Sequence, residues 1–184
     1  NISKTRITGI DVSVNGVGNI GPVNVTVMAG YTYAKPINLS DSAFLDSTGT
    51  LLNTNKLKYR NPELFKADVQ LDYKKFSVGW SSRFVSRMEN IDKRFEVPVI
   101  FEYLVPNTPL YNNPAFYILP GLKKYRDGQR GTGDWVSDFR ISYQASVHLK
   151  FSFVVNNVFN YEYMSRPGFV DAPRTLIGQV NIKF

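Results

Sequence analysis

Cysteine is absent from the 184 residues of this chain, which excludes a disulfide framework and a thiolate metal site. The absence is compatible with export without proving it. A run of about 18 apolar residues is also missing, and this excludes a transmembrane helix. No basic and then apolar leader follows Asn1, so we expect the printed sequence to start at a mature, trimmed or internal position.

Signatures of nucleic-acid binding are missing too, although the chain is basic. Its formal net charge is +7, and a basic balance raises the question of a nucleic-acid partner. No basic run, RNA-binding signature or zinc-ligand spacing occurs. We therefore expect no nucleic acid among the partners.

Helical periodicity is scarce, whereas aromatic residues are abundant. The chain has 11 Tyr and 13 Phe and no sustained 3.6-residue pattern, which favours an all-β protein. The mean hydropathy of −0.22 does not argue against a membrane protein. A transmembrane strand needs only about 9–11 residues and presents every second side chain to lipid, so its average is unremarkable.

Seven segments alternate in polarity with a period of two residues, as half-buried strands do. In one of them, Ala67, Val69 and Leu71 alternate with charged or amide side chains. Each segment thus has one face suited to hydrocarbon. The predicted strands are residues 6–14, 23–33, 65–73, 76–84, 135–143, 147–155 and 176–184.

The connections between these segments alternate between short and long. The short ones are residues 15–22, 74–75 and 144–146, and the long ones are residues 34–64, 85–134 and 157–175. Outer-membrane barrels have tight periplasmic turns and long extracellular loops, whereas long loops are uncommon in compact soluble domains. The sequence therefore predicts an all-β fold, an antiparallel transmembrane β-barrel segment of about seven strands in meander order.

Two further patterns support a wide barrel. Aromatic side chains gather near the strand ends, as in interfacial girdles. The faces opposite the apolar ones carry too many ionisable groups for the dry centre of a small barrel. The residues expected to face a wet or plugged lumen are Asp68, Asp72, Arg83, Asp138, Arg140, His148 and Lys150. The apolar faces should point outward and be exposed, at Val27, Leu71, Val78, Ile141 and Phe151.

The end of the chain carries the most specific motif. Residues 155–163 read Val-Asn-Asn-Val-Phe-Asn-Tyr-Glu-Tyr and are followed by Arg166, Pro167 and Gly168 before the last strand. This resembles the closing motif of TonB-dependent outer-membrane receptors. Residues 57–62 and 8–11 are similar to two other strand entries of that family, with Asp11 and Glu63 as departures. The last strand, with its terminal aromatic Phe184, resembles the signal read by the barrel assembly machinery.

The resemblance implies that residues 1–184 are the C-terminal portion of a receptor barrel of about 22 strands, without its plug domain. Seven strands would leave an open edge in lipid, so the partner strands and the plug must come from elsewhere. Two origins stay open. The chain is a part of a longer polypeptide, or it is a cleaved piece that remains associated with the others.

Catalytic constellations are lacking. The single histidine, His148, has no evident nucleophile beside it, and the glycines of residues 128–133 lack the lysine of a phosphate loop. Asp68 and Asp72 are more consistent with a charge ladder than with a pair of catalytic carboxylates. We therefore expect no enzyme, no catalytic residue, no metal and no cofactor.

The long loops hold the candidate ligand-binding residues, because aromatic and arginine side chains supply much of the energy at binding hot spots. The same side chains could instead pack the loops on themselves. The candidates are Arg87, Phe101, Tyr103, Tyr111, Tyr117, Arg126 and Arg166.

The predicted function is that of a receptor in the bacterial outer membrane, importing a scarce and bulky nutrient such as a ferric siderophore or a cobalamin-like complex. By resemblance, the energy comes from the TonB complex acting on the missing plug. The expected partners are the rest of the barrel and its plug, the TonB complex, the barrel assembly machinery, the nutrient and the lipid bilayer. Alternatives are a passive porin-like channel, a barrel subunit of a larger outer-membrane assembly, and a soluble β-sandwich that binds carbohydrate.

Overall fold

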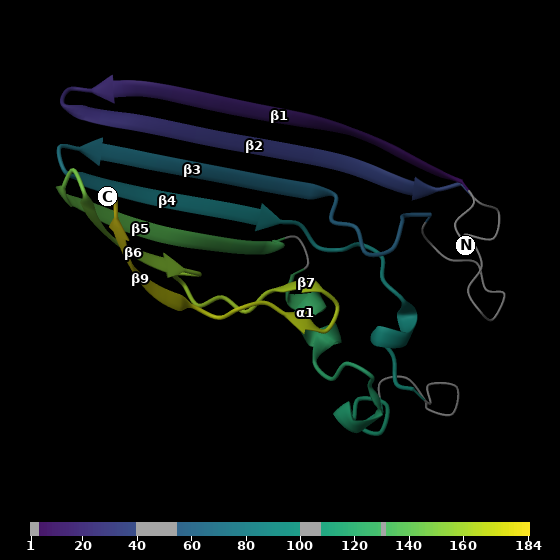
Figure 1. The fold of residues 1–184 in the computed structure, drawn as a ribbon. Helices are drawn as coiled ribbons and strands as arrows, with labels where there is room; N and C mark the ends of the chain where they lie inside the picture. Colours follow the sequence, from purple (N-terminus) through teal and green to yellow (C-terminus); the bar gives the residue numbers. More distant parts are fainter. Residues whose placement is uncertain (1–3, 40–54, 100–107, 130–131) are drawn as a thin grey trace.

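A computed structural model describes residues 4–39, 55–99, 108–129 and 132–184. Seven strands form one antiparallel sheet in the order β1-β2-β3-β4-β5-β6-β9, so each strand pairs with the next long strand along the chain (Figure 1). The predicted meander is confirmed. The strands are β1 (Thr5–Ile20), β2 (Val23–Asn38), β3 (Glu63–Tyr73), β4 (Phe76–Val85), β5 (Asp134–Ser146), β6 (Leu149–Asn156) and β9 (Thr175–Ile182).

The remaining described elements are short and lie in the long connections. Between β4 and β5 are two 3-10 turns, η2 (Lys93–Phe95) and η4 (Pro114–Phe116), and one helix, α1 (Leu122–Gly128). A small hairpin of β7 (Met164–Arg166) and β8 (Phe169–Val170) lies between β6 and β9. None of the helical elements in the described part of the chain is long and apolar enough to cross a membrane.

Two predicted turns were wrong. Asn15 to Ile20 continue β1 and pair with Val23 to Met28, so the first short turn is only Gly21 and Pro22. Gly21 has φ +57, a conformation that favours glycine. Likewise Gln144 to Ser146 belong to β5, with a register shift at that point. The turn between β5 and β6 is therefore formed by Val147 and His148.

The strand register places most of the apolar side chains of the seven strands on one face, although Met28, Val136, Val154 and Ile177 lie on the other. One row across the sheet reads Val27, Val69, Trp80, Phe139, Val155 and Leu176. On this face Leu71 is 42% exposed, Ile141 36% and Phe151 44%, and Val27 and Val78 are partly exposed. None of the five lies in a closed core, as predicted.

Two aromatic rows border the apolar face. Tyr31, Phe65, Phe84 and Trp135 lie toward the long loops, and Tyr73, Phe76, Tyr143 and Phe151 lie toward the short turns. Along β3 the rows are about eight residues apart, which is about 27 Å of strand and about 20 Å of height after a tilt near 40°. This height is close to the apolar band of about 25 Å on outer-membrane barrels.

The chain ends beside the short turns. β9 pairs with β6, with Val180 opposite Phe151 and Gly178 opposite Phe153, as predicted. The strand ends at Ile182, and the Lys183 N–H donates to the carbonyl of His148 in the short turn, at 2.9 Å. Phe184 is fully exposed at this end.

Replacing Phe184 by Asp in the intact protein should reduce its amount in the outer membrane several-fold, if the terminal aromatic is an assembly signal. The direct folding penalty of a charge near the interface is only about 0–1 kcal/mol, so instability would not explain such a loss. Membrane fractionation and quantitative immunoblotting measure the amount. Phe184→Tyr is the control and should assemble normally; normal assembly of Phe184→Asp would contradict the signal role.

Candidate functional site

The face opposite the apolar one carries most of the charge of β3, β4 and β5. We call its polar side chains the polar wall: Lys66, Asp68, Gln70, Asp72, Ser77, Ser81, Arg83, Asp138, Arg140 and Ser142. Lys150 of β6 lies opposite Gln144 and shares this face. The predicted lumen residues therefore fall on one face, apart from His148. That residue lies in a short turn, where its Nδ1 is 3.0 Å from the carbonyl of Lys183, so its placement on a strand was wrong.

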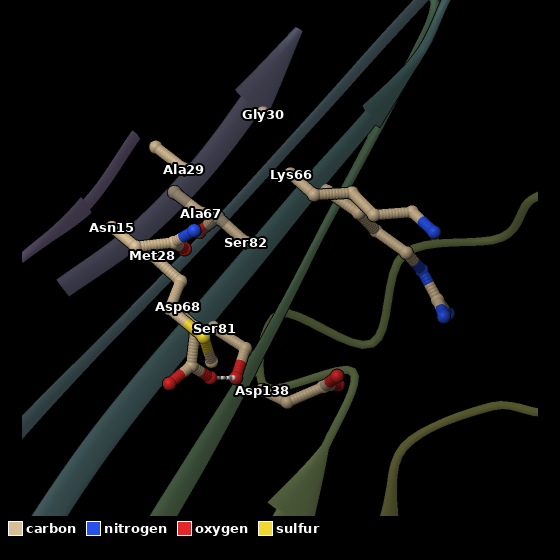
Figure 2. A pocket seen from close by; sticks show the side chains of 11 residues that line it. Asn15, Met28, Ala29, Gly30, Lys66, Ala67, Asp68, Ser81, Ser82 and Asp138 are labelled. Atoms are coloured by element: carbon tan, nitrogen blue, oxygen red, sulfur yellow. Dashed lines mark hydrogen bonds between the residues drawn. The ribbon is translucent and has the colours of Figure 1, made fainter. Parts of the chain in front are cut away.

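A bidentate ion pair crosses three strands of the polar wall. The Arg140 guanidinium donates from Nη1 to Asp68 Oδ2 at 2.7 Å and from Nη2 to Asp68 Oδ1 at 2.6 Å. Ser81 Oγ accepts a third bond from Arg140 at 2.8 Å and donates to Asp68, the bond drawn in Figure 2. We call Asp68, Ser81 and Arg140 the wall clamp.

Gly79 makes room for the wall clamp. Arg140 starts on β5 and reaches Asp68 on β3, so its side chain must pass over β4 at Gly79, its partner in the register. A Cβ at Gly79 would lie 2.3 Å from Arg140 Nε and 2.5 Å from its Cζ. Any larger residue would therefore displace the guanidinium.

Replacing Gly79 by Val should lower the free energy of unfolding of the intact protein in detergent by about 1–3 kcal/mol, the range for overpacking or for loss of a charged hydrogen bond. Denaturant unfolding followed by fluorescence measures it. Gly178→Val is the control, because a Cβ there meets nothing within 4 Å. Adding Arg140→Ala to Gly79→Val should cost little more; full additivity would mean that Gly79 does not act through the clamp.

A depression of about 380 Å³ opens on the wall beside the clamp (Figure 2). Lys66, Asp68, Arg83 and Asp138 supply its charges, and Gly30 of β2 leaves its side open. Within residues 4–39, 55–99, 108–129 and 132–184, no cluster of three or more His, Asp and Glu side chains is arranged to hold a metal ion.

Tyr125 joins the two long loops that follow β4 and β6. Its hydroxyl donates to Asp134 Oδ2 at 2.6 Å and accepts from Gln129 Nε2 at 2.8 Å and from the Met164 N–H at 2.9 Å. Burial, and then the bond to Asp134, raises the pKa of Tyr125 well above its usual range. The Tyr125 hydroxyl therefore links the loop that follows β4 to the loop that follows β6.

Arg126, one of the candidate ligand-binding residues, is buried and paired within the loops. It is 4% exposed, and its Nε donates to Glu96 at 2.5 Å. The turn of α1 directs it inward beside the buried Leu122. Arg126 and Arg166 line one narrow cleft of about 20 Å³, which holds about one water molecule rather than a nutrient.

The other candidate ligand residues are scattered. Arg87, Tyr111 and Tyr117 are half-buried, and burial raises the pKa of Tyr117. Arg166 is exposed on β7. Phe101 and Tyr103 lie outside the described residues. The binding role of this set stays a prediction.

Comparison with known proteins gives structural matches alone. No family model and no curated protein matches the sequence. The ferric-catecholate import receptor Fiu of Escherichia coli K12 matches with a TM-score of 0.63 and 21% identity, over 98% of this chain and 21% of that one. The siderophore receptor PiuA of Acinetobacter baumannii matches with a TM-score of 0.58 and 14% identity, over 98% and 22%.

The chain has the fold of an outer-membrane receptor barrel. The ferripyoverdine receptor of the outer membrane of Pseudomonas aeruginosa also matches this fold, with a TM-score of 0.56 and 19% identity, over 98% of this chain and 20% of that one. The predicted resemblance to TonB-dependent receptors is thus confirmed at the level of the fold, and the predicted outer-membrane location agrees with it. The chain spans about a fifth of the length of these receptors.

The closing motif of the receptor fold has a structural role. Asn157 is 3% exposed with φ 50, and its side chain brackets Tyr161. Its Oδ1 accepts from the Tyr161 N–H, and its Nδ2 donates to the Tyr161 carbonyl, both at 2.8 Å. Asn160, with φ 52, accepts from the Arg174 N–H at 2.9 Å. The two asparagines therefore close the loop on itself before β9.

A cluster of ion pairs and hydrogen bonds between two long loops was not predicted from the sequence. Lys58 and Tyr59, in the connection after β2, both donate to Asp92 in the connection after β4. Lys56 pairs with Glu89 at 2.5 Å, and the Tyr59 N–H donates to the Asn90 carbonyl at 2.8 Å. We call Lys56, Lys58, Tyr59, Glu89 and Asp92 the loop latch. The sequence did not reveal the loop latch, because its cations and its carboxylates lie in two separate loops.

The loop latch should loosen in acid. Hydrogen bonds from Lys58 and then Tyr59 hold the pKa of Asp92 below its usual range. Its contribution to stability is therefore present above the unfolded pKa of about 3.9 and is lost as pH falls through the lower folded value. Hydrogen-exchange protection of the Tyr59 amide should fall below about pH 4.

Asp92→Asn should lower the protection of the same amide already at pH 7. The control is Asp127→Asn, which removes an exposed ion pair with Lys123 within α1 and should leave the amide unchanged. Equal protection in all three proteins would show that Asp92 does not hold the two loops together.

Proposed function

We propose that this chain is the C-terminal portion of the barrel of an outer-membrane receptor that imports a scarce and bulky nutrient, such as a ferric siderophore or a cobalamin-like complex. The observation that carries the proposal is the two-faced sheet. One face is apolar and exposed between two aromatic rows, and the other bears the wall clamp and further charges. A wide barrel with a polar interior needs both.

The matched structures support import rather than catalysis. Fiu is described as an import receptor, the Pseudomonas protein as a ferripyoverdine receptor, and YddB of Escherichia coli as an outer membrane transporter. We propose the same class of role here, with no chemistry on the nutrient. The energy would come from the TonB complex through a plug, and the partners would include the remaining strands, the barrel assembly machinery and the bilayer.

Uptake by the intact protein tests the proposal. The full-length gene is expressed in a Gram-negative strain that lacks its own iron receptors, and accumulation of radioactive iron chelates and cobalamin is measured with and without active TonB. We expect TonB-dependent accumulation of at least one of these compounds. Passive flux of small solutes without TonB would instead favour the porin-like alternative.

The β-sandwich alternative has less support. All seven long strands belong to one sheet, and within the described residues no second sheet packs on its apolar face. A protein that stays soluble without detergent after purification would revive it.

A further inference from the structure

Two cations of the polar wall lie directly opposite each other without neutralisation. Lys66 of β3 pairs in register with Arg83 of β4. Like charges in such positions destabilise a sheet. Within the described part of the chain, neither of them forms an ion pair with a carboxylate. One row further along, Asp68 is neutralised by Arg140. The described part of the chain therefore supplies no carboxylate that offsets the cation pair.

The cation pair is arranged for contact with something outside the sheet. Lys66 is exposed and reaches away from Asp68 and Ser81 (Figure 2). Arg83 Nη2 donates to the Tyr163 hydroxyl at 2.6 Å, and its guanidinium carbon lies 5.2 Å from the centre of that ring. Since a guanidinium has five N–H donors, this contact fixes its position and leaves donors for another acceptor.

Space and access are both present at the pair. Lys66 and Arg83 line the depression of about 380 Å³, within the size range of small-molecule sites. Gly30 of β2 lies directly opposite Lys66 in the register and adds no side chain there. The pair lies one residue from Phe65 and Phe84, so it forms the row of the polar wall nearest to the long loops.

We propose that Lys66 and Arg83 form an anion-binding site and that the imported cargo is a negatively charged chelate, which presents carboxylate or catecholate oxygens to this pair. The inference rests on the proposed receptor function and adds the charge of the cargo. Asp68 and Asp138 lie at the other end of the depression. Asp68 is neutralised by Arg140. Asp138 keeps its charge, and its Oδ1 accepts the Asn157 N–H at 2.7 Å, so that oxygen is engaged by the loop that follows β6.

Binding to the intact receptor in detergent tests this site. The probes are a ferric tris-catecholate and ferric dicitrate, both anionic, and a neutral ferric tris-hydroxamate. Lys66→Gln and Arg83→Gln should each weaken binding of an anionic probe about tenfold, and the double variant about a hundredfold, with binding of the neutral probe unchanged. Lys74→Gln is the control, because Lys74 lies in the short turn beside Tyr73. Rising salt should weaken anionic binding by the wild type.

The binding and uptake results distinguish failure of the anion site from failure of the proposed receptor function. Wild-type protein that binds and imports only the neutral chelate would overturn the anion site and leave the receptor role intact. So would an unchanged affinity of the double variant for the anionic probes. If the double variant instead alters protease protection of the plug without changing chelate affinity, the pair faces acidic groups of the plug and the proposal is wrong. Absence of all binding and uptake by the wild type would overturn both.

Discussion

Val27→Arg is expected to destabilise the intact protein in phospholipid vesicles by about 2–4 kcal/mol, the penalty of a cation at the bilayer midplane of a barrel. Val27 lies in the middle row of the apolar face, four residues from Tyr31 in one aromatic row, and its partner Val69 lies four residues from Tyr73 in the other. An arginine there cannot reach either interface without distorting lipid. The midpoint of denaturant unfolding should fall accordingly.

The neighbouring residue provides the control for this prediction. Thr26 lies on the opposite face of β2, with Val17 and Gln70 as its partners across the sheet. Thr26→Arg should change the unfolding free energy by less than about 1 kcal/mol, since the same charge then faces the polar side. Equal losses in both variants would mean that the apolar face does not contact lipid.

Asn157→Ala should cost about 2–4 kcal/mol of unfolding free energy. The substitution removes both side-chain bonds that satisfy the Tyr161 N–H and carbonyl, and lost partners of this kind cost about 1–3 kcal/mol. It also places a Cβ-bearing residue without a local hydrogen bond at positive φ, which costs about 1 kcal/mol more.

Asn157→Gly separates the two contributions, because glycine tolerates the backbone conformation. It should be about 1 kcal/mol less harmful than Asn157→Ala in the same denaturant titration. If Ala and Gly were equally tolerated, with no measurable loss, the bracket around Tyr161 would not stabilise the closing loop.

The strands were predictable because their signal is local. The alternation of polar and apolar residues in 65–73 and 76–84 can be read from adjacent residues alone. Both strands are present in the structure, and their ends differ from the predicted ones by at most two residues. The first turn was misplaced for the same reason. Gly16, Gly18 and Asn19 resemble turn residues, yet their backbones pair with β2, because the cross-strand ladder outweighs local propensity.

The contacts that shape the candidate site could not be read from the sequence. Tyr125 and Asp134 meet only after the long connection has folded back onto β5, and Lys58 meets Asp92 across two separate loops. Arg126 was a candidate for ligand binding because of its residue type, and its burial and its ion pair with Glu96 could not be read from the sequence. Gly79 gave no signal at all, since its meaning depends on an arginine 61 positions further along the chain that lies beside it only in the sheet.

The wall clamp has a mechanical consequence. Arg140 ties β5 to β3 across the intervening β4, and a slip of any one of these strands by one residue would turn its clamp side chain to the opposite face. Sliding of adjacent strands must therefore break several charged hydrogen bonds together instead of one backbone bond at a time. The clamp therefore stiffens this part of the sheet against shear between β3, β4 and β5.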